Sequence, residues 1–227
     1  MSERTRSLLQ GVRLEFPLLI GVFPFGLIYG ASALRSGLSP ALAQSMSSVV
    51  FAGSAQLLTT QLIHAASPAV VIIATIVIVN LRHVLYSASV APYVSHLPAR
   101  WRVLLAYLLT DEAYAATIVH YEKEGATPTG HWFFLGAGVS LWATWQVSTA
   151  LGIFLGTTMP ESWPLDFALP LTFIAMLVPT LGHRSLVAAA LSAGGVALLA
   201  DSLPHNLGLV LAALLGMSVG MFVEGRQ

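Results

Sequence analysis

Charged side chains inside long apolar runs are the residues of this sequence most suited to chemistry. Arg82 lies near the middle of the apolar run 69–92, and Asp111 and Glu112 lie together near the middle of the run 103–119. One such charge at the centre of a membrane helix costs about 2.5–3.5 kcal/mol even on insertion scales, so it is usually paired or functional. An arginine can bind a carboxylate at two points, and a carboxyl group can carry a proton.

These three charges allow two interpretations. In the first, Arg82 forms a buried ion pair with Asp111 or Glu112 that only fixes the register of two helices. In the second, the cluster is functional, because one cation cannot neutralise two acids and the spare carboxyl group is open to protonation by desolvation. On a continuous helix the two acids would point about 100° apart, so both could not face Arg82.

Polar side chains accompany these charges at helical spacing. Asn80 and His83 share one helix face, and Arg82 shares the adjacent face with Tyr86. In the run 40–64, Gly-Ser at positions 53 and 54 allows a membrane helix to unwind and present backbone groups to a ligand. The candidate substrate-binding residues are Gly53, Ser54, Gln56, Asn80, Arg82, His83 and Tyr86, and the candidates for proton coupling are Asp111 and Glu112.

Signatures of enzymes are missing from the sequence. It contains no cysteine, no G-x-S-x-G, no P-loop and no G-x-G-x-x-G, which leaves no thiol chemistry and no recognisable catalytic residue. No histidine pair has metal-ligand spacing supported by a carboxylate, so we expect no metal and no cofactor. A formal net charge of zero also argues against nucleic acid as a partner.

The elements that must hold these residues are membrane helices. Only 9% of the residues are charged and 56% are hydrophobic, against about 25% charged in a soluble domain. Lipid cannot satisfy an open backbone, so we predict an all-α integral membrane protein, a single transporter domain over residues 1–227. We expect a bundle of about seven or eight transmembrane helices, in which a segment can be re-entrant or broken. The predicted spans are 16–34, 40–64, 69–92, 103–119, 131–155, 167–182, 185–200 and 205–223.

The distribution of basic residues gives an orientation. With eight crossings and a cytoplasmic N-terminus, the positive-inside rule is satisfied by most arginines and lysines, while Arg35, Arg100 and Arg102 fall outside. A re-entrant segment between residues 40 and 92 would move Arg100 and Arg102 inside.

Small-residue patterns predict close helix contacts. Three GxxxG pairs let helix backbones approach, and their faces could accept a helix of a partner protein. They are Gly26 with Gly30, Gly152 with Gly156, and Gly216 with Gly220. Residues 24–58 and 170–199 also show a faint similarity, of the kind that internal repeats leave in transporters.

Three motifs in order resemble one family of membrane proteins. They are residues 51–56 (FAGSAQ), residues 80–87 (NLRHVLYS) and residues 110–112 (TDE), and the opening from Phe16-Pro17 to Gly37 adds to the likeness. The chain closely resembles the AzlC family, the large subunits of bacterial branched-chain amino acid exporters, over most of its length. After about Trp163 the likeness is less distinctive.

The resemblance implies a two-component exporter in the bacterial inner membrane. A small multi-span AzlD-type subunit would be the partner, and valine, leucine, isoleucine or a similar amino acid the substrate. In proton-coupled alternating access, Arg82 and the unwound backbone at Gly53 and Ser54 would hold the substrate carboxylate. Asp111 or Gln56 would accept from its ammonium group, and Glu112 or Asp111 would exchange the proton. A membrane assembly or scaffold subunit, whose polar clusters only bind a partner, is the alternative.

Overall fold

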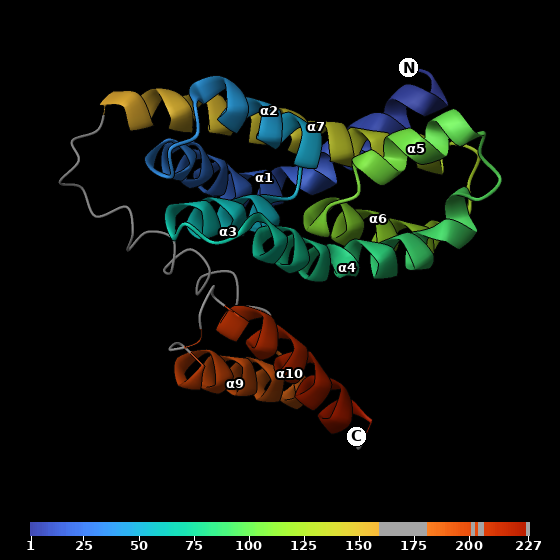
Figure 1. Ribbon diagram of the computed structural model, residues 1–227. Helices are drawn as coiled ribbons and strands as arrows, with labels where there is room; N and C mark the ends of the chain where they lie inside the picture. Colours follow the sequence, from blue (N-terminus) through green and yellow to red (C-terminus); the bar gives the residue numbers. More distant parts are fainter. Residues whose placement is uncertain (159–180, 201–202, 204–206, 226–227) are drawn as a thin grey trace. The chain divides into compact units, whose positions relative to one another are not determined.

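The computed structural model describes residues 1–158, 181–200, 203 and 207–225, and this part of the chain is helical. Four of its helices, α1, α4, α7 and α10, are long and apolar enough to cross a membrane. The all-α class is therefore confirmed, whereas the predicted span 167–182 lies almost wholly outside the described residues. The helices in Figure 1 are α1 (Glu3–Arg35), α2 (Pro40–Val50), α3 (Gly53–His64), α4 (Ala69–Val94), α5 (Ala99–Tyr107), α6 (Asp111–Glu124), α7 (Gly130–Thr158), α9 (Arg184–Leu199) and α10 (Leu207–Glu224).

The chain divides into two compact units. The first comprises Met1–Leu57 and Val79–Pro160, and it contains every candidate site residue. The second comprises Leu58–Ile78 and Glu161–Gln227. Within the second unit α9 packs against α10, where Gly216 and Gly220 lie against alanines of α9.

Two long helices, α1 and α7, form the core of the first unit and run side by side in the same direction (Figure 1). Gly11 packs on Phe133 near the start of both helices, and Gly30 packs on Thr149 farther along. A Cβ atom on Gly30 would lie 2.4 Å from the Thr149 carbonyl oxygen, and one on Gly152 would lie 2.2 Å from a carbonyl oxygen of α1. The two backbones are in direct contact, so no larger residue fits without moving the helices apart.

The GxxxG pairs make contacts inside the chain. Gly26, Gly30, Gly152 and Gly156 all lie in the contact between α1 and α7, and the third pair packs α10 on α9. The expectation that these faces are open to a partner helix is therefore wrong, because each is already occupied by a neighbouring helix of the same chain.

The predicted span 103–119 is two short helices rather than one. Trp101, near the start of α5, lies against Trp132 at the start of α7, with ring centroids 5.0 Å apart. Leu108, just after α5, lies against Gly138, one-third of the way along α7. Tyr121 then brings the end of α6 back to the first residue of α7. The segment is a helical hairpin that turns at residues 108–110.

The predicted span 40–64 is also interrupted. α2 ends at Val50 and α3 begins at Gly53, and Phe51 between them has the left-handed φ of 41°. The interruption comes directly before Gly53 and Ser54, where the sequence predicted unwinding.

The direction of α3 follows from its connection to α4. Ser54 at the start of α3 contacts Arg82, which is 13 positions after Ala69, the first residue of α4. These positions are about 20 Å apart at 1.5 Å per residue. α3 is only 12 residues long and ends at His64, five positions before Ala69, so it must run back along α4 to reach it. The α2–α3 segment is therefore a second hairpin, with its turn at Phe51 and Ala52.

The two hairpins belong to an inverted repeat. Each follows a long helix, α1 or α4, after a link of four residues, 36–39 or 95–98. The second half of α4 runs alongside α6 in the same direction. α6 runs back along α7, which is parallel to α1, so α4 runs opposite to α1. The hairpins therefore enter from opposite ends of the unit. Their tips meet where the Tyr107 ring lies 5.9 Å from that of Phe51 and its hydroxyl donates to the Ser48 carbonyl. The repeat predicted from residues 24–58 and 170–199 lies partly outside the described residues.

The hairpin geometry corrects the predicted location of Arg100 and Arg102. The Arg4 guanidinium lies 6.0 Å from the centre of the Trp132 ring, and Trp132 contacts Trp101. Arg100 and Arg102 flank Trp101, so they lie at the same end of the unit as Arg4 rather than at the opposite end. Tryptophans are typical of either membrane interface, whereas basic residues gathered at one end are typical of the cytoplasmic one.

The contact between α1 and α7 predicts a sharp difference between two glycines of α1. Gly30→Ala should destabilise the protein by about 1–3 kcal/mol, because its new Cβ overlaps the α7 backbone. Gly21→Ala is the matched control, since a Cβ there meets nothing within 4 Å. Thermal unfolding in detergent, followed by size-exclusion chromatography, measures both. Equal melting temperatures for the two variants would disprove the close contact.

The hairpins predict where introduced cysteines are accessible. The protein has no cysteine, so Ala65→Cys and Ser95→Cys can each be labelled without background. With a cytoplasmic N-terminus and two returning hairpins, Cys at 65 should react from outside with a membrane-impermeant maleimide and Cys at 95 only from inside. Two fully crossing segments would give the reverse pattern. Ser36→Cys should react from outside in both cases, so it is the positive control for the labelling reaction.

Candidate polar site between the hairpin tips

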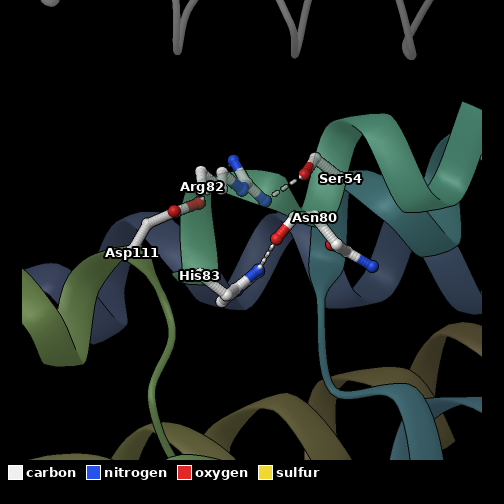
Figure 2. A network of polar contacts seen from close by, with 5 residues as sticks. All are labelled: Ser54, Asn80, Arg82, His83 and Asp111. Atoms are coloured by element: carbon white, nitrogen blue, oxygen red, sulfur yellow. Dashed lines mark hydrogen bonds and ion pairs between the residues drawn. The ribbon is translucent and has the colours of Figure 1, made fainter. Parts of the chain in front are cut away.

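The guanidinium of Arg82 joins the two hairpins. Arg82 lies in the middle of α4, and its Nη1 is 2.8 Å from Oδ2 of Asp111. Its Nη2 donates to the hydroxyl of Ser54, as Figure 2 shows. The side chains of Arg82 and Asp111 are 28% and 29% exposed, so the pair is not sealed off from a ligand. Of the two acids that the sequence offered, Asp111 is the partner of Arg82.

The break before α6 brings Asp111 to this position. α6 begins at Asp111, and Thr110 before it is extended, with φ −116° and ψ 179°. Asp111 and Glu112 therefore occupy the first turn of a helix, where the helix dipole stabilises negative charge. The prediction that both acids lie inside one continuous helix is wrong for this reason.

The break before α3 explains Gly53 and Ser54. A Cβ atom on Gly53 would lie 2.9 Å from the indole ring of Trp145, so glycine lets α3 begin against α7. Ser54 in the first turn then directs its hydroxyl toward Arg82. The first N–H groups of a helix lack helical acceptors and attract anions. The start of α3 thus adds to the positive potential around Arg82.

Several buried polar atoms around Arg82 lack hydrogen-bond partners in the part of the chain that the structure describes. They are the donor Nε of Arg82 and the acceptors Oδ1 of Asn80 and Oδ1 of Asp111. The Tyr86 hydroxyl also interacts with the Asp111 carboxylate. Buried polar atoms are usually paired, so an unpaired donor between unpaired acceptors marks a place that a polar ligand can complete.

The remaining predicted site residues have different surroundings. His83 places Nδ1 3.3 Å from the Asn80 carbonyl oxygen, so both belong to the Arg82 region (Figure 2). Gln56 is fully buried, and its Oε1 accepts from the indole of Trp145 at 3.1 Å. The bond to Trp145 uses one of the two lone pairs of that oxygen, so acceptance from a substrate ammonium by Gln56 stays a prediction.

Stacked tyrosines connect α4 to α6 beyond the ion pair. The rings of Tyr86 and Tyr114 stack with centroids 4.3 Å apart, and Tyr93 and Tyr121 stack at 4.8 Å. The Tyr114 hydroxyl also donates to Ser89. Of this ladder only Tyr86 was predicted from the sequence, although the spacing of Tyr114 and Tyr121 by seven residues is a visible signal of a shared helix face.

One buried acid was missed entirely. Glu15 has no exposed surface in the described structure, and α1 extends well before residue 16, the predicted start of the first span. A signal was present, because Ser7, Gly11 and Glu15 follow at four-residue spacing and all three are buried.

The comparison with known families follows this geometry. The family described as AzlC protein matches residues 17–159, which include both hairpins, Arg82 and Asp111. The chain belongs to the AzlC family. The resemblance drawn from the three motifs is therefore confirmed.

AzlC-like relatives occur in bacteria and archaea. The chain is 27% identical over 184 residues to the inner membrane protein YgaZ of Escherichia coli, covering 78% of this chain and 75% of YgaZ. It is 30% identical over 212 residues, 91% of each chain, to an uncharacterized membrane protein of Archaeoglobus fulgidus. A membrane protein of Helicobacter pylori is 23% identical over 163 residues, 71% of this chain and 70% of its own. No solved structure matches the chain. Membership of this family, the named membrane-protein relatives and the apolar helices make the chain a membrane protein, which is consistent with a transporter-type role.

Proposed function

We propose that this protein is the large subunit of a two-component secondary transporter that exports branched-chain or similar amino acids across the bacterial inner membrane. A small AzlD-type membrane subunit is its partner, and a proton gradient drives the cycle. In this proposal the protein is multi-pass and works without a catalytic residue, a cofactor or a metal. The observation that carries the proposal is the set of unpaired donor and acceptor atoms around Arg82, between the tips of two opposed hairpins.

The chemistry of that set matches a zwitterion. A substrate carboxylate needs donors, and Arg82 Nε, together with the start of α3, supplies them. A substrate ammonium group needs acceptors, and Asn80 Oδ1 and Asp111 Oδ1 are available. Interrupted helices whose ends meet at a central site are the arrangement in which many transporters bind small charged substrates. The aliphatic side chain of the substrate then packs on neighbouring apolar residues.

The inverted repeat supports alternating access. One hairpin enters from each end of the unit, so movement of one tip opens the site to one side, and movement of the other opens it to the opposite side. Arg82 bonds a residue at the start of α3 and another at the start of α6. A substrate that competes for Arg82 therefore changes the contacts of both hairpins at once.

Exchange of Arg82 for lysine tests the binding site. Lysine keeps the charge but loses the planar fork, so Arg82→Lys should bind leucine about ten- to a hundredfold more weakly, from the loss of about 1.5–3 kcal/mol. Counterflow of labelled leucine in proteoliposomes that contain the AzlD-type subunit measures this. Arg100→Lys, at the water-facing start of α5, is the matched control and should exchange normally.

Three outcomes would count against parts of the proposal. Normal leucine exchange by Arg82→Lys removes Arg82 from the binding site and leaves it a structural ion-pair partner. A wild-type pair that binds tightly but exchanges no amino acid favours the scaffold function. Full exchange without the small subunit removes the two-component requirement.

Variants of the two acids should show which acid binds the substrate and which carries the coupling proton. Asp111 pairs with Arg82, so Asp111→Asn should weaken leucine binding, whereas Glu112→Gln should leave counterflow intact and abolish its acceleration by a pH gradient. Both measurements use the same proteoliposomes. Unchanged acceleration in both variants would assign the proton to another group.

A further inference from the structure

A cavity at one end of the first unit lies outside the site described so far. Its volume is about 400 Å³, which is within the range of small-molecule binding sites. The walls come from the start of α1, the end of α6 and the connection between α6 and α7. Glu3, Arg6 and Gln10 of α1 and Glu124 of α6 are its charged and amide residues. The cavity is therefore large enough for a molecule of the size of an amino acid.

Two contacts between distant parts of the chain shape this cavity. The Ser7 hydroxyl donates to the carbonyl oxygen of Thr129 at 2.8 Å, which ties the connection before α7 to the start of α1. The His120 ring stacks on the Phe133 ring, with centroids 3.8 Å apart and an angle of 4° between the planes. This stack holds the end of α6 against α7. Packed elements thus form the cavity, although its charged side chains are themselves exposed.

Charges of both signs line the cavity without pairing. Arg6 supplies a guanidinium, and Glu3 and Glu124 supply two carboxylates. No ion pair or side-chain hydrogen bond joins any of these three side chains to another residue of the described chain. A guanidinium binds carboxylates through two parallel hydrogen bonds, and a carboxylate accepts from an ammonium group. The lining therefore offers donors to an anionic group and acceptors to a cationic group.

Ligands of a single charge fit this lining less well. A free anion would meet Arg6 but also two carboxylates, which repel it. A metal ion would meet the guanidinium, and among the described residues no three acidic or histidine side chains lie close enough together to hold one. A molecule with an anionic and a cationic group side by side satisfies both kinds of partner. The carboxylate and ammonium groups of an α-amino acid are such a pair.

The cavity is distant from Arg82. Glu124 lies 13 positions after Asp111, the first residue of α6, and Asp111 is the residue that pairs with Arg82. This separation is about 20 Å at 1.5 Å per residue. The cavity is also at the end of the unit that the basic residues predict to be cytoplasmic, because part of its lining comes from the first turns of α1, beside Arg4.

We propose that this cavity is a second binding site for a zwitterionic amino acid, separate from Arg82 and open to the cytoplasm. Arg6 binds the carboxylate of the ligand, and Glu3 or Glu124 binds its ammonium group. These partners contact only the two groups that all α-amino acids share, so the site accepts amino acids with different side chains. The choice of leucine as the probe rests on the proposed function, whereas the charge pattern of the cavity does not.

Photolabelling of the full-length protein in detergent with a diazirine analogue of leucine tests the site. After irradiation, peptides that contain residues 3–10 and 120–129 should carry the label, and excess leucine should prevent this. Isocaproate, which lacks the ammonium group, and isoamylamine, which lacks the carboxylate, should not prevent it. Arg6→Gln should reduce the label about tenfold, because the ligand carboxylate loses a charged donor. Arg100→Gln removes another exposed arginine, outside the cavity, and should be labelled as the wild type is.

Three results would overturn the proposal. They are the absence of displaceable label from the cavity peptides of the wild type, equal labelling of Arg6→Gln and the wild type, and protection by isocaproate as effective as protection by leucine. The variant Arg82→Lys separates this inference from the proposed function, since it should keep the label in the cavity and lose the label around residue 82. A wild type labelled in the cavity but not around Arg82 would refute the proposed substrate site and leave the second site standing.

Discussion

The charge of Arg82 in the middle of an apolar helix is the constraint on which the candidate site depends. Lipid cannot solvate a guanidinium, so the protein must surround it with its own polar groups. It does so with Asp111 and Ser54, each in the first turn of a helix that starts inside the hairpin region. The contacts that compensate this one charge thus hold α3 and α6 in place. Only because these helices start inside the hairpin region can their first turns contact Arg82.

The interrupted helices create a requirement of their own. Each break frees backbone groups that need cover, because unpaired N–H and C=O groups are costly within a membrane. Trp142 donates to the Tyr107 hydroxyl, which donates to the Ser48 carbonyl, so side chains close the gap between the tips. Gln146 likewise bonds Gln44 and the Ser47 carbonyl on α2. α7 therefore supports both hairpins through polar side chains as well as through packing.

Much of the candidate site could be predicted from the sequence, and the errors have a physical cause. Arg82, Asp111 and Ser54 stood out because polar residues in apolar runs are costly. The break at residues 108–110 could not be predicted, because Leu-Leu-Thr contains neither glycine nor proline. It is stabilised by distant contacts such as that of Leu108 with Gly138. Glu15 was missed because spans were bounded at charges, whereas α1 carries its buried face past that residue.

The contact between α1 and α7 limits which parts of the molecule can move. Interfaces made of interlocking side chains can rearrange by changing rotamers, but glycine backbones in contact have no rotamers to change. If α1 slid along α7 by one residue, Cβ atoms would meet carbonyl oxygens at several points along the contact between the two helices. The two helices therefore act as a fixed frame with one permitted alignment. Any conformational cycle must be carried by short segments around that frame, where two or three residues at each turn act as the joints.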